Sequence, residues 1–167
     1  MKSSKRLFFI IASIAITIVI DQITKVIVRA YIDPKQVIPV IGKYFSLHNV
    51  ENKGAFLGMG SELSDLSRIV LLLILPIIVL GFVLRYILRD KTLDHWSLFA
   101  FSSIIGGGIA NVFDRIAYGS VTDFFFIKLN NILRTGIFNM ADLSVTTGMI
   151  ILVIVSFRKK KNIKSDT

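Results

Sequence analysis

The chain has 167 residues, of which 53% are hydrophobic and 19% are charged, and it carries a formal net charge of +9. Soluble domains average about 25% charged residues, and a chain of this length forms one domain, so the composition indicates a single membrane domain over residues 1–167. The sequence has no cysteine and two histidines. This excludes disulfides, iron–sulfur clusters, thiolate zinc sites and a cysteine nucleophile, and we expect no metal ion and no cofactor.

Four apolar segments are each long enough to cross a bilayer, which takes about 20 helical residues. They predict helices over residues 7–28, 69–88, 97–115 and 139–157. The first segment follows a basic stretch, as a cleaved signal peptide does, but no small-x-small cleavage site comes after it, so we expect a retained helix. The second contains Pro76, which membrane helices tolerate when neighbouring groups satisfy the freed carbonyl.

Two longer connecting segments, about 30–68 and 116–138, lie between these helices on the same side of the membrane. Two β-prone runs in the first, 36–40 and 44–50, are separated by Gly42 and predict a small sheet. The second contains residues 121–127, which are rich in aromatics and predict an amphipathic segment at the membrane interface. The expected fold is therefore an all-α membrane protein with four transmembrane helices, a small sheet outside the membrane and an interfacial segment.

The basic residues predict the orientation, because Lys and Arg in short loops accumulate on the cytoplasmic side. Of the 20 basic residues, 11 lie at the N-terminus, between the second and third helices, or in the tail. We therefore expect both termini to face the cytoplasm. This distribution explains the net charge without a nucleic-acid partner, and the basic tail is more simply an anchor beside anionic lipids than an RNA-binding segment.

With this topology, ionisable and amide side chains from distant parts of the chain gather near the outer ends of the helices. Such groups are costly within a membrane, which makes each a functional candidate. The layer contains the following residues: Asp21, Asn52, Asp114, Arg115, Asp123, Asn139 and Asp142.

Structural roles are the alternative for single members of this layer. Asp142 could cap the fourth helix, Asp114 could pair with Arg115, and Asp21 could pair with Lys25 one helical turn away. A gathering of all these groups at one depth is harder to explain by structure alone.

The available chemistry is narrow. His48 and His95 are predicted at opposite ends, and a serine nucleophile served by Lys25 or Lys53 lacks a recognisable elbow motif. Two carboxylates held close together share a proton, so that one activates water while the other hydrogen-bonds a scissile carbonyl. This predicts an aspartic amide hydrolase, but it leaves open which two of the four aspartates form the pair.

A proton-coupled carrier or a non-enzymatic assembly subunit is the rival class. Carriers place ionisable groups near the membrane midplane and often contain internal repeats. Here the carboxylates are predicted at one rim and no repeat is visible, which disfavours that class.

Five motifs appear in order along the chain: Asp21-Gln22-x-Thr24-Lys25, Asn52-x-Gly54-Ala55, Gly107-Gly108-x-x-Asn111-x-x-Asp114-Arg115, Val121-x-Asp123-Phe124 and Phe138-Asn139-x-Ala141-Asp142. Together they resemble the lipoprotein signal peptidase family, the bacterial type II signal peptidases, over essentially the whole chain. The resemblance implies that Asp123 and Asp142 are the catalytic pair. It implies supporting or substrate-binding roles for Asp21, Lys25, Asn52, Gly54, Asn111, Asp114, Arg115, Asn139 and Ala141.

The resemblance also implies a small extracytoplasmic β-cradle over residues 36–50, as well as the reaction and its setting. The family cleaves the signal peptide of prolipoproteins just before a cysteine that already carries diacylglycerol, and globomycin-type antibiotics inhibit it. We accordingly expect a monomer in the bacterial cytoplasmic membrane, with its active site at the outer face and with the diacylglyceryl-modified prolipoprotein and membrane lipid as partners. The reactive cysteine would then belong to the substrate, consistent with none in this chain.

Two positions depart from the family pattern. Phe56 stands where a second alanine is common, and Ala110 stands where glycine usually precedes Asn111. Neither change affects a carboxylate, so we expect catalysis to be intact and any effect to fall on the shape of the substrate groove.

Overall fold

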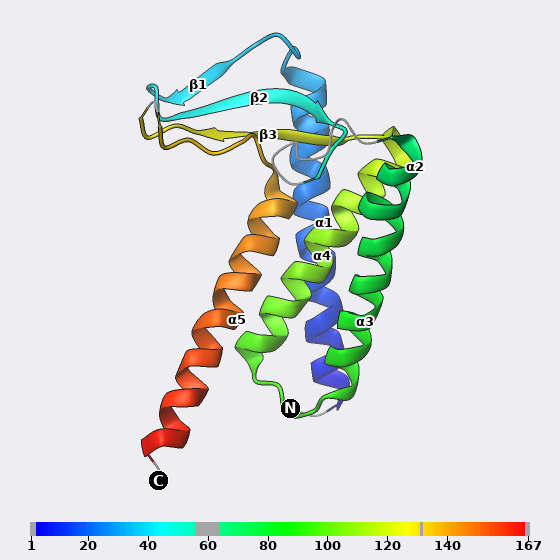
Figure 1. The fold of residues 1–167 in the computed structure, drawn as a ribbon, viewed down its shortest axis with the longest axis vertical. Coiled ribbons are helices and arrows are strands. Elements are labelled where there is room, and N and C mark those ends of the chain that lie inside the picture. The colour runs from blue at the N-terminus through cyan, green and yellow to red at the C-terminus, as the bar shows by residue number, and fades with distance from the viewer. Residues whose placement is uncertain (1–2, 56–63, 131, 166–167) are drawn as a thin grey trace.

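The computed structural model describes residues 3–55, 64–130 and 132–165. Its helices are α1 (Ser3–Tyr31), α2 (Asp65–Arg68), the π-helix η2 (Ile69–Ile74), α3 (Leu75–Arg89), α4 (His95–Tyr118) and α5 (Met140–Ser165), and its strands are β1 (Ile38–Ile41), β2 (Phe45–Asn52) and β3 (Val121–Ile127). The helices form an elongated bundle with the sheet across one end, and both chain termini lie at the other end (Figure 1).

Four helical spans among the described residues are long and apolar enough to cross a membrane, with mean hydropathies from 1.4 to 2.7. The first span is α1, the third is α4 and the fourth is α5 up to Arg158. The second span is the continuous run formed by α2, η2 and α3. This confirms the four predicted helices, although most begin or end a few residues beyond the predicted bounds. The second span changes to α-helical geometry at Leu75, directly before Pro76.

Helix α4 is the centre of the bundle and packs against α1, α3 and α5. The glycines at 106–108 allow this, since they approach α1, α5 and α3 in turn. A methyl group added at Gly107 would lie only 2.5 Å from the carbonyl oxygen of Ala141. Small residues at such positions let membrane helices come into backbone contact, and here they bring the start of α5 against α4.

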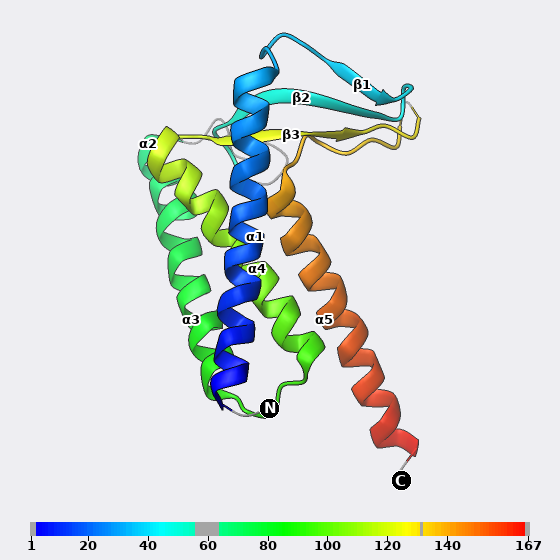
Figure 2. The same cartoon turned by 180° about the vertical axis from the view of Figure 1, so that it is seen from behind.

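The sheet is antiparallel with the order β1-β2-β3, and it covers the end of the bundle (Figure 2). Strands β1 and β2 confirm the sheet predicted over residues 36–50, with Gly42 at the turn in a left-handed conformation (φ 48°). Residues 121–127, expected as an interfacial segment, form β3 instead, and Val50 lies opposite Asp123 in its pairing with β2. Their pattern alone did not show that the backbone of β2 would be available to pair with them.

Two apolar clusters hold these parts together. Val28 of α1 and Phe124 of β3 are buried in one cluster at the sheet end. Ile10, Ile87 and Leu98 are buried at the opposite end, where α1, α3 and α4 meet. Each such side chain contributes about 1.5–3 kcal/mol when fully buried, so the sheet is fixed relative to the helices that carry the polar layer.

Candidate active site

Asp21, Lys25 and Asp114 form a buried ionic cluster between α1 and α4. The ammonium group of Lys25 lies 2.7 Å from Asp21 Oδ2 and 2.8 Å from Asp114 Oδ2, and all three side chains are fully buried. The suggested pairing of Asp21 with Lys25 is therefore confirmed. Asp114 pairs with Lys25 rather than with its neighbour Arg115, because successive helical residues point in different directions.

Asn139 and Asp142 form a reciprocal cap at the start of α5. Asn139 Oδ1 accepts from the backbone N–H of Asp142 at 2.9 Å, and Asp142 Oδ2 accepts from the backbone N–H of Asn139 at 3.2 Å. This is the geometry of a capping box. Asp21 Oδ1 accepts a further N–H of the first turn, that of Ala141, at 2.8 Å, so α1 also fixes where α5 begins. The cap suggested for Asp142 is therefore supplied by Asn139, and Asp142 lies three residues further on and bonds back to it.

Asp123 projects from β3 and is 2% exposed. Asn139 donates to its Oδ1 at 2.6 Å, and Asn52 of β2 donates to its Oδ2 at 2.8 Å. Burial, together with the nearby charge of Asp142, raises the pKa of Asp123 to about 7, although the hydrogen bonds from Asn52 and Asn139 act in the opposite direction. This carboxyl group therefore holds a proton in a pH range where an ordinary aspartate has lost it.

Asn111 of α4 connects the ionic cluster to the two carboxylates. Its Nδ2 donates to Asp142 Oδ1 at 2.9 Å, and its Oδ1 accepts from Lys25 at 2.8 Å and from Asn139 at 3.2 Å. Asn139 in turn donates to Asp123. Asp123 and Asp142 are therefore fixed by a shared set of amide donors, and Asp142 is also mostly buried.

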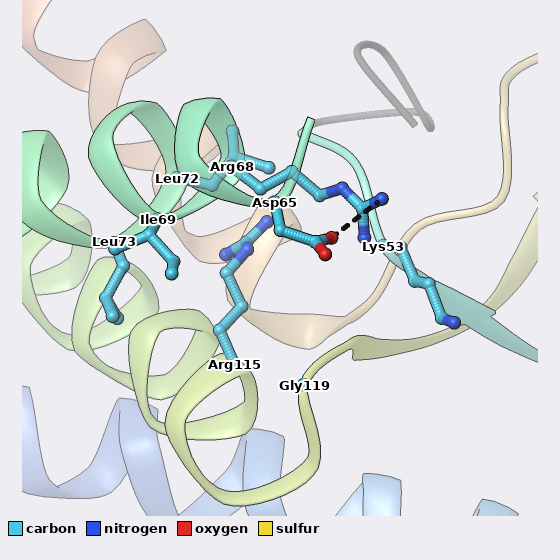
Figure 3. A pocket seen from close by; sticks show the side chains of 8 residues that line it. All are labelled: Lys53, Asp65, Arg68, Ile69, Leu72, Leu73, Arg115 and Gly119. Carbon is cyan, nitrogen blue, oxygen red and sulfur yellow. Dashed lines mark ion pairs between the residues drawn. The ribbon is translucent and has the colours of Figure 1, made fainter. Parts of the chain in front are cut away.

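Arg115 extends the network towards a cavity beside it. Its Nη2 donates to the carbonyl oxygen of Gly54 at 2.9 Å and its Nη1 to that of Asn111 at 3.2 Å. The cavity has a volume of about 260 Å³ and lies between the second span and the end of α4, with an Arg68–Asp65 ion pair at 3.4 Å on its α2 wall (Figure 3). It is lined by Lys53, Asp65, Arg68, Ile69, Leu72, Leu73, Arg115 and Gly119.

All of the residues given a catalytic or supporting role in the sequence analysis belong to this one connected network of hydrogen bonds and ion pairs, although they come from α1, β2, α4, β3, α5 and the loops beside β2 and α5. Gly119 helps to bring them together: it ends α4 in a left-handed conformation (φ 74°), and β3 begins two residues later. Among the residues that the structure describes, no group of three His, Cys, Asp or Glu is placed to hold a metal ion.

A second polar group, missed in the sequence analysis, adjoins the ionic cluster, because Arg29 Nη2 lies 3.5 Å from Asp114 Oδ2. Arg29 Nε donates to Thr122 Oγ1 at 2.7 Å, and Thr122 donates to Glu51 Oε1 at 2.7 Å. Arg29 follows Lys25 by one helical turn, and Thr122 directly precedes Asp123. The four-residue spacing along α1 could have identified Arg29, whereas the pairing of Thr122 with Glu51 depends on the strand register.

Gln22 was quoted in the first motif but given no role, and its amide donates to Asp114 Oδ1 at 2.9 Å and to Asp21 Oδ2 at 3.3 Å. Of the two positions that depart from the family pattern, Ala110 is fully buried, with its carbonyl oxygen 3.5 Å from the Gln22 amide. Phe56 lies outside the described residues.

Known proteins resemble the chain over most of its length. A family model described as signal peptidase (SPase) II matches residues 13–158. A lipoprotein signal peptidase of Treponema denticola is 34% identical over 157 residues, covering 90% of this chain and 91% of that protein. A lipoprotein signal peptidase of Pseudomonas aeruginosa is 31% identical over 144 residues, covering 86% and 85%.

A solved structure, described as a bacterial membrane enzyme determined by the in meso method at 2.3 Å resolution, has a TM-score of 0.80 and 26% identity. The match covers 92% of this chain and 90% of that one. The arrangement of four spanning helices and a small sheet is therefore one that an experimentally determined membrane enzyme shares.

Proposed function

The chain belongs to the signal peptidase II family, and we propose that Asp123 and Asp142 are its catalytic pair, so that it acts as an aspartic endopeptidase. Its activity is that of a lipoprotein signal peptidase, the removal of signal peptides from prolipoproteins. We propose further that the substrate is a prolipoprotein already modified with diacylglycerol. The cut then falls just before the lipidated cysteine.

The observation that carries the catalytic assignment is the shared hydrogen bonding of two buried carboxylates. Asn139 donates its side-chain amide to Asp123 and its backbone N–H to Asp142. Two carboxylates in such a site do not ionise together, so the pair retains one proton. A pKa of about 7 suits Asp123 to hold that proton at neutral pH.

In this mechanism the ionised carboxylate accepts a proton from water as the water oxygen attacks the scissile carbonyl carbon. The protonated partner donates a hydrogen bond and then its proton to the carbonyl oxygen, which stabilises the tetrahedral intermediate. When the intermediate collapses, the carbon–nitrogen bond breaks, the leaving amine takes up the proton that the first carboxylate had accepted from water, and a hydroxyl of the intermediate returns a proton to the second carboxylate. The products are the signal peptide carboxylate and a new N-terminal residue, and no cofactor takes part.

Asn52 and Arg115 are proposed to orient the substrate, since Asn52 contacts Asp123 directly and Arg115 lines the neighbouring cavity. The lipid chains are assigned to an apolar crevice of about 310 Å³ between α1, α4 and α5. Its lining includes Ile20 and Leu143, each adjacent in sequence to a buried aspartate of the site. A membrane-held substrate could then reach the carboxylates without leaving the bilayer.

The proposed setting is the bacterial cytoplasmic membrane, with the sheet and the carboxylates on the outer side and both termini in the cytoplasm. The placement of Arg6, Arg85, Arg89 and Lys91 in the end opposite the sheet supports this orientation, because cytoplasmic loops are enriched in Lys and Arg. We propose that the chain acts as a monomer, since the network needs no residue from a second copy.

The test is processing of a diacylglyceryl-modified prolipoprotein by the full chain in membranes, followed as a gel shift. Asp123→Asn and Asp142→Asn each keep the side-chain shape and should lower turnover at least a hundredfold, in line with the about 10²–10⁴-fold contribution of acid–base groups. Asp33→Asn, which changes an exposed aspartate in the turn after α1, is the matched control and should process normally. Wild-type turnover in either site variant, with the thermal unfolding midpoint retained, would overturn the assignment of the pair.

A further inference from the structure

A second cavity, of about 280 Å³, lies at the end of the bundle opposite the sheet. Its lining residues come from the start of α1, from the loop between α3 and α4 and from the start of α4, and these three segments lie at the same end of the bundle (Figure 2). It is lined by Ser3, Arg6, Lys91, Leu93, His95 and Leu98. Two basic side chains and a histidine thus face one small space, far from the carboxylate network.

Arg6 gives this cavity a fixed rather than a diffuse charge. Its side chain is only 6% exposed, and its Nη2 donates to the carbonyl oxygens of Ile87 at 2.7 Å and Asp90 at 2.6 Å. Its Nε is buried without a hydrogen-bond partner among the described residues. A guanidinium that is buried and hydrogen-bonded to carbonyl oxygens, with no carboxylate in the cavity lining, favours an anion in that cavity.

The nearby acidic side chains offset part of this charge without lining the cavity, since hydrogen bonds from Thr92 and, more weakly, the charge of Arg6 lower the pKa of Asp90. The carboxylate of Asp90 accepts from the backbone N–H and the hydroxyl of Thr92, at 2.8 and 2.7 Å. The carboxylate of Asp94 caps α4 by accepting from the N–H of Ser97 at 2.8 Å. Neither is among the lining residues.

An apolar groove of about 260 Å³ adjoins the basic cavity, and the two share His95. The remaining lining of the groove is aromatic: Phe9, Trp96 and Phe99. Trp96 is 62% exposed, which is typical of tryptophan at a membrane interface. A basic cavity and an apolar groove therefore lie next to each other at the depth where the polar and apolar parts of a lipid meet.

We infer that this paired site binds one anionic phospholipid of the leaflet opposite the carboxylates. Its phosphate would lie in the cavity between Arg6, Lys91 and His95, and an acyl chain would lie in the groove against Trp96. Basic pockets between membrane helices are established binding places for anionic lipid headgroups. The adjoining groove favours a lipid over free phosphate, because a free anion has no apolar chain that could lie in the groove.

Trp96 is the only tryptophan in the chain, so its fluorescence reports on the groove directly. The experiment titrates the purified full chain in neutral detergent with phosphatidylglycerol that carries bromine atoms on its acyl chains, which quench tryptophan on contact. Phosphatidylcholine with the same brominated chains is the comparison lipid. Saturable quenching is expected at a several-fold lower concentration of phosphatidylglycerol.

Lys91→Gln removes one cation from the cavity and should weaken the binding of phosphatidylglycerol about fivefold, as expected for about 1 kcal/mol per basic residue near lipid. Lys5→Gln and Arg89→Gln remove a charge at the same end from residues that do not line the cavity, and they should leave the titration unchanged. An equal loss in these controls, or equal quenching by phosphatidylcholine, would overturn the inference. Complete relief of quenching by an equal concentration of inorganic phosphate would assign the cavity to the free anion instead.

Discussion

Replacing Asn52 with alanine should move the pH dependence of the peptidase to higher pH. Asn52 Nδ2 donates to Asp123 Oδ2 at 2.8 Å, and this hydrogen bond stabilises the ionised carboxylate. Without it the protonated form of Asp123 is favoured, so its pKa rises above the present value of about 7. If Asp123 holds the shared proton, activity on the alkaline side is lost when that proton leaves, and the alkaline limb follows the pKa upwards.

The size of the shift follows from the strength of this bond. A hydrogen bond to a charged group is worth about 1.5–3 kcal/mol, and one pKa unit corresponds to about 1.4 kcal/mol, which gives a rise of about one to two units. The alkaline limb should therefore move from about pH 7 to about pH 8–9. The assay measures kcat/KM for a diacylglyceryl-modified prolipoprotein peptide across this range in mixed micelles, where the limb reports the titration of the carboxylate pair as a whole.

A matched control separates this effect from damage to the sheet. Asn49 lies on the same strand, is buried, and donates to the carbonyl oxygen of Ile32 rather than to a carboxylate. Asn49→Ala should lower activity without moving the limb. An unmoved or lowered limb in Asn52→Ala, or the same upward shift in Asn49→Ala, would refute the reasoning.

Two further predictions concern stability, measured by thermal or denaturant unfolding in detergent. Lys25→Met leaves two buried carboxylates without their common partner and should lower the free energy of unfolding by about 3–5 kcal/mol. Adding Asp21→Asn to this variant should recover part of that loss. A Lys25→Met protein as stable as wild type would contradict the stabilising role of the ionic cluster. Gly107→Ala places a methyl group 2.5 Å from a backbone oxygen of α5 and should cost about 1–3 kcal/mol and slow processing, whereas Gly81→Ala, which meets nothing within 4 Å, should do neither.

The helical part of the fold was predictable because a bilayer imposes a simple rule on sequence. Backbone groups inside hydrocarbon must bond within their own segment, so an apolar run of about 20 residues has one outcome. Residues 121–127 show where this rule stops. Outside the membrane an aromatic-rich run can be an interfacial segment or a strand, and the outcome depended on whether β2 offered it a free edge.

The polar layer was predictable in depth but not in its pairing. Each of Asp21, Asp114 and Asp142 stands near the end of an apolar run, so the topology alone brings them to one level of the membrane. It does not determine that Asp114 contacts Lys25 rather than its neighbour Arg115, because such contacts depend on the rotation and spacing of α4 against α1. Those in turn depend on close backbone approach at the glycines of α4.

The amino-acid sequence by itself therefore determined the number of spans, the placement of both chain termini at the same end of the bundle, and the depth of the ionisable residues. These follow from the free energy of moving apolar and charged groups between water and lipid, which depends on composition along the chain. Only the tertiary structure decided that Asn139 and Asn111 hold Asp123 and Asp142 together. Hydrogen bonds have short reach and fixed direction, so they depend on where packing places each side chain to within fractions of an ångström.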